Sequence, residues 1–184
     1  MPIGREAALS DFETALLSEP SSHIEKPRIA RIILALLVLF FTTLYAPASL
    51  TAEVRLDAES VLSVLNQDRA RYDLPLLAQN QTLEQAAAAK ARDILENDYF
   101  AHTSPAGLKP WNFIKNAGFQ YTFAGENLAV GYDNALELQN DFMGSPGHRE
   151  NLLSPLYSEI GIAVVKGQFR GRPATVTVEM FAAP

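Results

Sequence analysis

The chain has 184 residues, of which 48% are hydrophobic and 20% charged, with a formal net charge of −6 and no cysteine. The lack of cysteine excludes a disulfide framework, a thiol nucleophile and a thiolate-bound zinc ion. The part after Ala52 carries 11 basic and 16 acidic residues, so it offers no basic surface for nucleic acid. We therefore expect one globular domain, an additional hydrophobic segment and no nucleic-acid partner.

The N-terminal part predicts a leader followed by a membrane segment. Residues 1–28 are polar and of mixed charge, and we expect them to form a disordered cytoplasmic leader. Within residues 29–52, the run from Ile32 to Ala52 has no charge and follows several basic side chains, which predicts that the chain after it is exported. The segment is either a cleaved signal peptide or a signal anchor. The long polar leader favours the anchor, which leaves residues 53–184 as the exported domain.

Two amphipathic helices are expected at the start of this domain. The first runs from about Asp57 to Tyr72 and ends at a Leu-Pro-Leu sequence. The second opens at a capping box formed by Thr82 and Gln85. Its apolar side chains recur on one stripe, which consists of Leu83, Ala87, Ala91, Ile94 and Leu95.

The middle of the domain alternates short elements with loops. Residues 97–107 form a loop that carries His102, and residues 110–118 form a short helix between a proline and a glycine. Residues 119–130 alternate enough to predict a strand or an extended arm that contains Glu126. A fourth helix is expected to begin at a cap on Asp133, to end at Gly144 and to bury Leu136, Leu138 and Phe142.

A further short helix is expected to begin at Ser145-Pro146. We expect the Ser145 hydroxyl to accept a backbone N–H, while the fixed φ of Pro146 suits the first helical position. His148 then falls in the first turn, and Pro155 follows the end of the helix. The sequence therefore predicts a histidine held on a short, braced element.

The C-terminal part changes to a period of two residues. Ile160, Ile162 and Val164 alternate with small residues, and Val176, Val178 and Met180 alternate with polar ones, which predicts two strands joined by a hairpin at 167–173. Helices followed by antiparallel strands indicate an α+β fold.

Three side chains, His102, Glu126 and His148, have the chemistry of an open zinc-type site. Sequence spacing does not prove that they converge, and each has a structural alternative such as a hydrogen bond to the backbone. Ser104 and Ser145 supply hydroxyl groups, although no nucleophile-elbow sequence surrounds either serine.

Four motifs follow one another along the chain: FAHTSPAG, AGENLAVG, SPGHRENLL and SEIGIAVV. In this order they resemble the CAP superfamily in its bacterial, SCP-like form, which includes cysteine-rich secretory proteins and plant pathogenesis-related proteins. The resemblance covers about Asp57 to Phe181, including Asn66 and Arg69 of the first helix. It implies an α-β-α sandwich with a small antiparallel sheet, here preceded by one hydrophobic N-terminal helix. It also implies a large central cleft and, in most members, an extracellular location.

The resemblance further implies a cleft tetrad of two histidines and two acids. Its first histidine corresponds to His102, its first acid to Glu126 and its second histidine to His148. The position of the second acid is occupied by Ser145, so the tetrad is incomplete. Candidate replacements on the preceding helix are Glu137 and Asp141.

These features indicate an exported or membrane-anchored CAP domain that binds a lipid, glycan or protein partner at the cell envelope. Its cleft, with His102, Ser104, Glu126, Ser145 and His148, is expected to be able to hold a divalent metal ion, zinc before others. Two other functions stay open. One is a metal- or serine-dependent hydrolase of peptide or cell-wall substrates, and the other is a structural envelope protein. The expected partners are the membrane, through residues 29–52, and an unidentified envelope ligand or protein.

Overall fold

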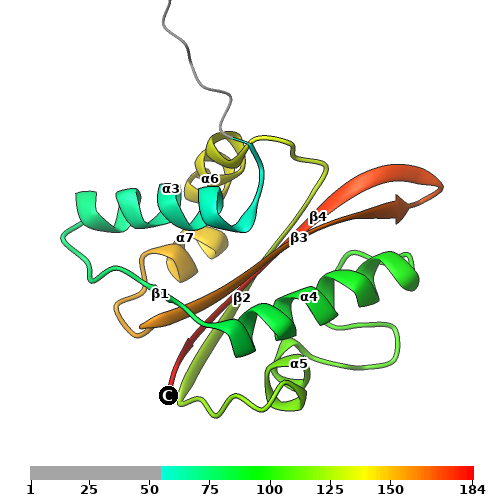
Figure 1. The fold of residues 1–184 in the computed structure, drawn as a ribbon, viewed down its shortest axis with the longest axis horizontal. Coiled ribbons are helices and arrows are strands. Elements are labelled where there is room, and N and C mark those ends of the chain that lie inside the picture. The colour runs from blue at the N-terminus through cyan, green and yellow to red at the C-terminus, as the bar shows by residue number, and fades with distance from the viewer. Residues whose placement is uncertain (1–54) are drawn as a thin grey trace, which may run out of the picture. The chain divides into compact units, whose positions relative to one another are not determined.

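A computed structural model describes residues 55–184 (Figure 1). The leader and the membrane segment expected within residues 1–52 lie outside this part of the chain. Within residues 55–184 no helix has the length and apolar character needed to cross a bilayer. The elements are α3 (Ala58–Arg71), β1 (Ala78–Gln79), α4 (Gln81–Glu96), α5 (Pro110–Asn116), β2 (Phe123–Val130), α6 (Ala135–Gly144), α7 (Pro146–Leu152), β3 (Glu159–Phe169) and β4 (Arg172–Ala183).

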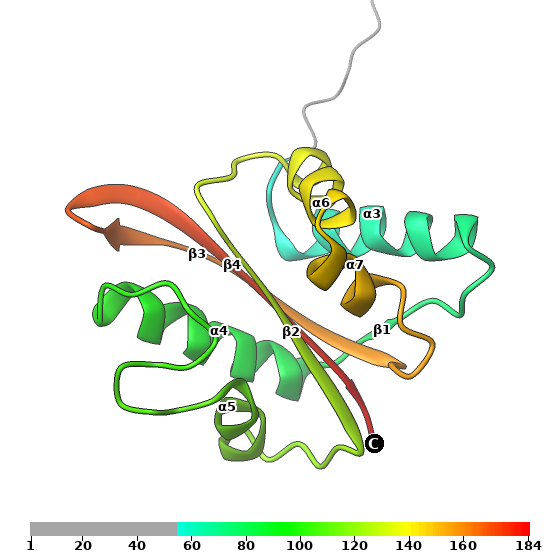
Figure 2. The same cartoon turned by 180° about the vertical axis from the view of Figure 1, so that it is seen from behind.

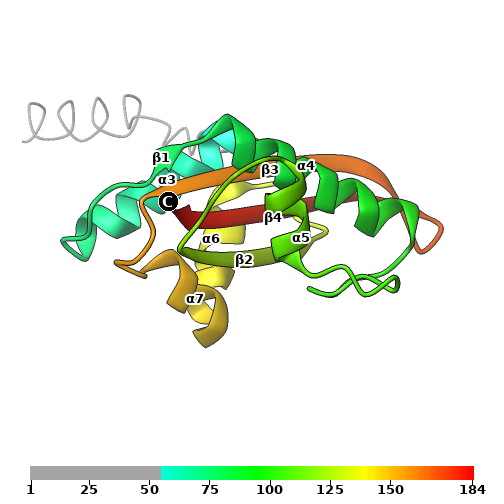
Figure 3. The same cartoon turned by 90° about the horizontal axis from the view of Figure 1, so that it is seen from below.

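A sheet of four strands in the order β1-β3-β4-β2 forms the centre of the domain. The three long strands lie side by side (Figure 3) and pair antiparallel, as the sequence predicts. The short β1 pairs parallel with β3 and was not predicted. Both of its residues are exposed, so it leaves no hydrophobic pattern in the sequence. β2 is the long strand at the edge of the sheet.

Helices cover both faces of this sheet. Figures 1 and 2 show α3, α6 and α7 on one side and α4 and α5 on the other. Each side has its own hydrophobic core, and both cores include residues of the strands. The predicted α-β-α sandwich is therefore confirmed. Gly161 permits close packing of α4 on β3, because a Cβ atom there would lie 2.0 Å from the backbone carbon of Leu83.

The start of α4 differs from the prediction. Asn80 is the cap, and its side-chain oxygen accepts hydrogen bonds from the backbone N–H groups of Thr82 and Leu83 at 2.8 and 3.1 Å. The expected capping box of Thr82 and Gln85 is therefore wrong. An asparagine two residues earlier already satisfies these donors, and the helix begins at Gln81.

The start of α6 also differs by one residue. Asn134, and not Asp133, accepts hydrogen bonds from the N–H groups of Leu136 and Glu137, at 2.9 and 3.1 Å. Leu136 was expected in the core but is 47% exposed. The buried face of α6 instead consists of Ala135, Leu138, Gln139 and Phe142, which recur at helical spacing.

The hairpin between β3 and β4 is tighter than the range 167–173 suggested. Phe169 pairs with Arg172, so only Arg170 and Gly171 form the turn. Their φ angles are +51° and +73°, the left-handed pair that suits the twist of a two-residue hairpin. The rest of the expected loop continues the two strands.

Candidate functional site

Glu126 lies on β2 with its side chain buried on the α4 and α5 side of the sheet. It stands opposite Met180 of β4, which belongs to the core on that side. Its Oε1 lies 2.6 Å from Nδ1 of His102, while its Oε2 is buried and has no hydrogen-bond partner in the described part of the chain. Burial raises the pKa of Glu126 to about 7, although the His102 hydrogen bond and the charges of Lys90 and His102 act in the opposite direction.

His102 stands on the loop between α4 and α5 and is largely exposed. Because its Nδ1 is occupied by Glu126, the Nε2 atom is left for other partners. A carboxylate that accepts from Nδ1 holds an imidazole in one tautomer and one orientation. The fold therefore brings His102 and Glu126 into contact, and the contact leaves a polarised imidazole that faces solvent.

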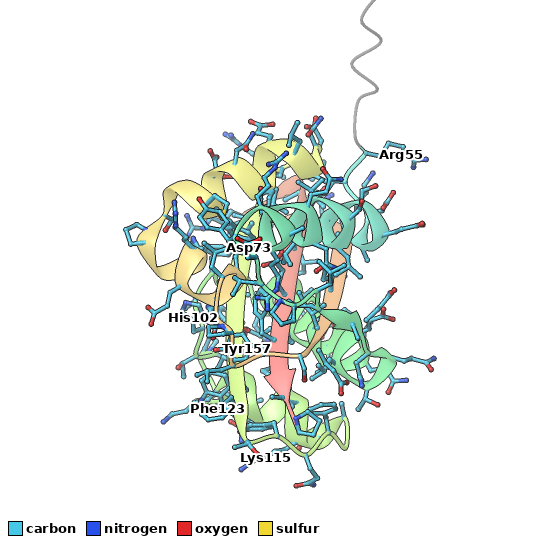
Figure 4. All side chains as sticks on the ribbon, turned by 90° about the vertical axis from the view of Figure 1, so that its left-hand side faces the viewer. Arg55, Asp73, His102, Lys115, Phe123 and Tyr157 are labelled. Atoms are coloured by element: carbon cyan, nitrogen blue, oxygen red, sulfur yellow. The ribbon has the colours of Figure 1, made fainter. Side chains whose placement is uncertain are left out.

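A hollow of about 330 Å³ adjoins this pair. Figure 4 views the side of the molecule that carries His102 and Tyr157. The hollow is bounded by the loop before α5, by α5 itself, by β2 and by α7. The residues that line it are His102, Thr103, Lys109, Pro110, Trp111, Ala124, Gly125, Glu126 and Asn151. Trp111 packs against the core on the α4 side of the sheet and also lines the hollow.

His148 reaches this region from the other face of the sheet. It lies on α7, where its ring packs against Phe142 with centroids 4.7 Å apart. Burial lowers the pKa of His148, and the charge of His102 lowers it further, so the two imidazoles lie within electrostatic reach of each other. His148 itself is not among the residues that line the hollow, whereas Asn151 of the same helix is.

A network of amide side chains joins α7 to the edge of the sheet. Asn151 donates to the backbone oxygen of Glu126 at 3.1 Å and to Oδ1 of Asn127 at 2.9 Å. Asn127 donates to the backbone oxygen of His148 at 3.3 Å and to Oε2 of Glu179 at 3.0 Å. The helix that carries His148 is thereby tied to the strand that carries Glu126.

Glu179 was not recognised as a site residue from the sequence. It is fully buried on β4, opposite Asn127, and burial raises its pKa to about 8 while the hydrogen bond from Asn127 lowers it. In the sequence it alternates with the apolar residues Val178 and Met180, a pattern that predicts a strand and assigns Glu179 no function. Helices cover both faces of β4, however, so the polar face of that strand is also internal.

The three expected metal ligands do not form a ready cluster. Among residues 55–184 no group of three or more His, Asp or Glu side chains is placed to hold a metal ion. Glu126 uses one oxygen to hold His102, which makes it a supporting residue of the imidazole. Among the described residues the expected set of three ligands is therefore not assembled, and zinc binding stays a prediction.

The other predicted site residues have different surroundings. Ser104 is buried, and its hydroxyl accepts the N–H of Leu108 at 3.0 Å, which braces the loop that carries His102. Ser145 lies between α6 and α7 and makes no side-chain cap hydrogen bond, so its expected capping role is wrong. The backbone N–H of Ser145 instead closes the end of α6. The two candidate replacement acids, Glu137 and Asp141, line a separate hollow beside α6.

The sequence is similar to one protein family and to a bacterial protein. The profile of the cysteine-rich secretory protein family, CAP, matches residues 62–181. Protein YkwD of Bacillus subtilis (strain 168) is 35% identical over 125 residues, which are 68% of this chain and 47% of that protein.

Two solved structures share the fold. An extracellular protein of Bacillus anthracis with an SCP domain has a TM-score of 0.60 and 25% identity over 68% of this chain and 40% of that one. An outer surface protein of Borrelia burgdorferi has a TM-score of 0.59 and 23% identity over 70% of this chain and 96% of that one. The chain thus spans less than half of YkwD and of the Bacillus anthracis structure.

Proposed function

This chain belongs to the CAP family of cysteine-rich secretory proteins, and from that premise we propose that it is a ligand-binding protein of the cell envelope. The ligand binds in the hollow beside His102. The observation that carries this proposal is the hydrogen bond between an exposed imidazole and a buried carboxylate at the edge of that hollow. A buried carboxylate costs free energy, and here it orients a side chain that faces solvent.

The chemistry of the hollow supports a ligand that carries both polar and apolar groups. Trp111 supplies an aromatic side chain, whereas Thr103 and Lys109 supply hydrogen-bond donors. A few convergent polar groups in a partly apolar pocket are typical of small-ligand sites.

A location outside the cytoplasm is part of the proposal. The names of two structural relatives describe an extracellular protein and an outer surface protein. The uncharged run from Ile32 to Ala52, with basic residues before it, provides the export signal in this chain. The long polar leader favours an anchor, which keeps the domain at the membrane surface.

We also propose a divalent metal ion as a ligand of this region, although residues 55–184 hold no preformed group of three ligands for it. The free Nε2 of His102 and the ring of His148 would hold it, and Glu126 would fix the first of these rings. The missing fourth residue of the family tetrad leaves more positions for water. When bound, the ion would supply positive charge and Lewis acidity beside the hollow.

Isothermal titration of the full-length protein with zinc chloride tests this proposal. We expect saturable binding that weakens at least about ten-fold in His102→Ala and in His148→Ala. His23→Ala is the control, because it removes the one histidine outside the domain. Equal binding by the wild type and both domain variants would reject the metal site.

A hydrolase remains a second candidate, because the short contact between His102 and Glu126 also suits a general base. Its substrates would be peptides or cell-wall polymers bound in the same hollow. Release of soluble fragments from purified cell walls, lost in both His102→Ala and Glu126→Gln, would favour this activity. Binding of the same material without release would favour the ligand-binding function.

A further inference from the structure

Lys90 lies in the middle of α4 and is fully buried beneath the loop that carries His102. Its Nζ donates three hydrogen bonds, to the Tyr99 hydroxyl at 2.9 Å and to the backbone oxygens of Ala101 and His102 at 3.0 and 2.8 Å. The ammonium group also lies 4.8 and 5.4 Å from the ring centroids of Tyr99 and Phe113. All three of its N–H donors are therefore used, and two of them hold the backbone of the loop.

A lysine in this position is costly if it serves only to fill space. Within residues 55–184 no carboxylate lies at ion-pair distance from its Nζ. The same position on α4 belongs to the buried stripe of Leu83, Ala87 and Ile94, where an apolar side chain would pack without desolvating a charge. The loop backbone is the feature that the ammonium group serves.

Two side chains hold His102, and each binds a different group of this residue. Lys90 binds the backbone oxygen of His102 from the core side, whereas Glu126 binds Nδ1 of the same residue from β2. One contact fixes where the residue stands, and the other fixes which way its ring points. The Lys90 charge also lies near enough to Glu126 to lower the pKa of that carboxyl.

We propose that Lys90 is a positioning residue of the cleft, which fixes the backbone of His102 so that its ring can meet both Glu126 and a ligand. This inference rests on the proposed function, in which the imidazole of His102 contacts the ligand. Lys90 itself contacts no ligand, and it acts through the loop.

Nuclear magnetic resonance of the histidine imidazoles in the full-length protein tests the inference without any ligand. The long-range coupling between ring protons and nitrogens reports which nitrogen carries the proton. With neutral imidazoles we expect the wild type to hold His102 in one tautomer, protonated on Nδ1. The variant Lys90→Met keeps most of the apolar stem but has no donors, and we expect it to lose this single tautomer.

Two controls separate positioning from general stability. Leu65→Ala removes buried volume from the core on the opposite side of the sheet, so it should lower the melting temperature while leaving the His102 signals unchanged. Lys115→Met removes an exposed lysine from α5 and should change neither measurement. A folded Lys90→Met protein with wild-type His102 signals would overturn the inference.

If Lys90→Met does not fold, the ammonium signal of Lys90 in the wild-type protein tests the inference instead. A buried, hydrogen-bonded ammonium group should give a slowly exchanging signal with contacts to the backbone of residues 101 and 102. An ammonium group in rapid exchange with water would contradict the inference. Zinc titration of the same samples distinguishes the two proposals. If Lys90→Met loses the single tautomer but the wild type binds no zinc, the positioning role of Lys90 is supported and the metal site is rejected.

Discussion

The imidazole of His102 and the carboxylate of Glu126 meet at 2.6 Å, although the histidine side chain is 61% exposed and the glutamate side chain only 1%. The pair therefore connects the core on the α4 side of the sheet to the surface of the hollow. His148 approaches from α7 on the opposite face, and the two sides meet around β2 because this strand is the edge of the sheet. The position of β2 explains how residues from both faces can serve one cleft.

The buried carboxyl of Glu179 should make stability depend on pH. Burial raises its pKa from 4.5 to about 8, so between these values the folded protein retains a proton that the unfolded chain releases. Stability due to this group is therefore complete below about pH 4.5 and falls as the pH rises toward 8. Glu179→Gln, which cannot ionise, should remove this fall.

Urea unfolding at several pH values between 5 and 8 measures the effect. We expect the stability of Glu179→Gln relative to the wild type to increase by at least about 1 kcal/mol across this range. Glu96→Gln, at an exposed position on α4, should follow the wild type. Parallel curves for wild type and Glu179→Gln would show that burial does not perturb this carboxyl.

Gly125 lines the hollow, and its surroundings leave no space for a larger side chain. A Cβ atom there would lie 2.5 Å from the Tyr157 hydroxyl and 2.6 Å from Oδ1 of Asn151. Gly125→Ala should therefore displace Asn151 and destabilise the protein by about 1–3 kcal/mol. Gly147→Ala is a matched control, because nothing lies within 4 Å of its added Cβ atom. Equal melting temperatures for the two variants would contradict the close packing at Gly125.

Arg69 should be irreplaceable by lysine. Its buried guanidinium donates to the backbone oxygens of Pro75, Leu152 and Ser154 at 2.8, 2.8 and 3.0 Å, and so fixes the end of α7. A lysine cannot reproduce this fork, and Arg69→Lys should cost about 2 kcal/mol or more. Arg71→Lys, which alters an exposed arginine paired with Asp68, should cost little in the same unfolding experiment. A small effect of Arg69→Lys would reject the proposed fixing of α7.

The cap of α6 provides a test at single-residue resolution. Asn134→Ala should cost about 1 kcal/mol because two backbone donors lose their acceptor. Asp133→Ala should have a much smaller effect. The melting temperatures of both variants measure these effects. A larger loss of stability in Asp133→Ala than in Asn134→Ala would show that Asp133 is the cap, as the sequence predicts.

Much of the fold follows from the sequence because its signals are local. Hydrophobic spacing places α3 and α4, and alternation places β3 and β4. Side-chain caps were less predictable, since Asn80 and Asn134 compete with equally suitable neighbours. The exposed β1 carries no pattern, because its backbone hydrogen bonds alone place it in the sheet.

The site was only partly predictable for a different reason. The order of the motifs predicts that His102 and Glu126 share a site. It does not show that Glu126 binds the imidazole of His102, whereas the sequence predicts Glu126 as a third metal ligand. Glu179 was missed because alternation cannot tell that both faces of β4 are covered. Lys90 carried a usable signal, since it stands three residues after Ala87 and four before Ile94, on the buried stripe.

The most direct test of the cleft as a binding site is an anomalous difference map from a zinc-soaked crystal of the protein. We expect a peak about 2 Å from Nε2 of His102 and close to the ring of His148, with Glu126 still bound to Nδ1. A peak elsewhere on the molecule, with none at His102, would contradict the account.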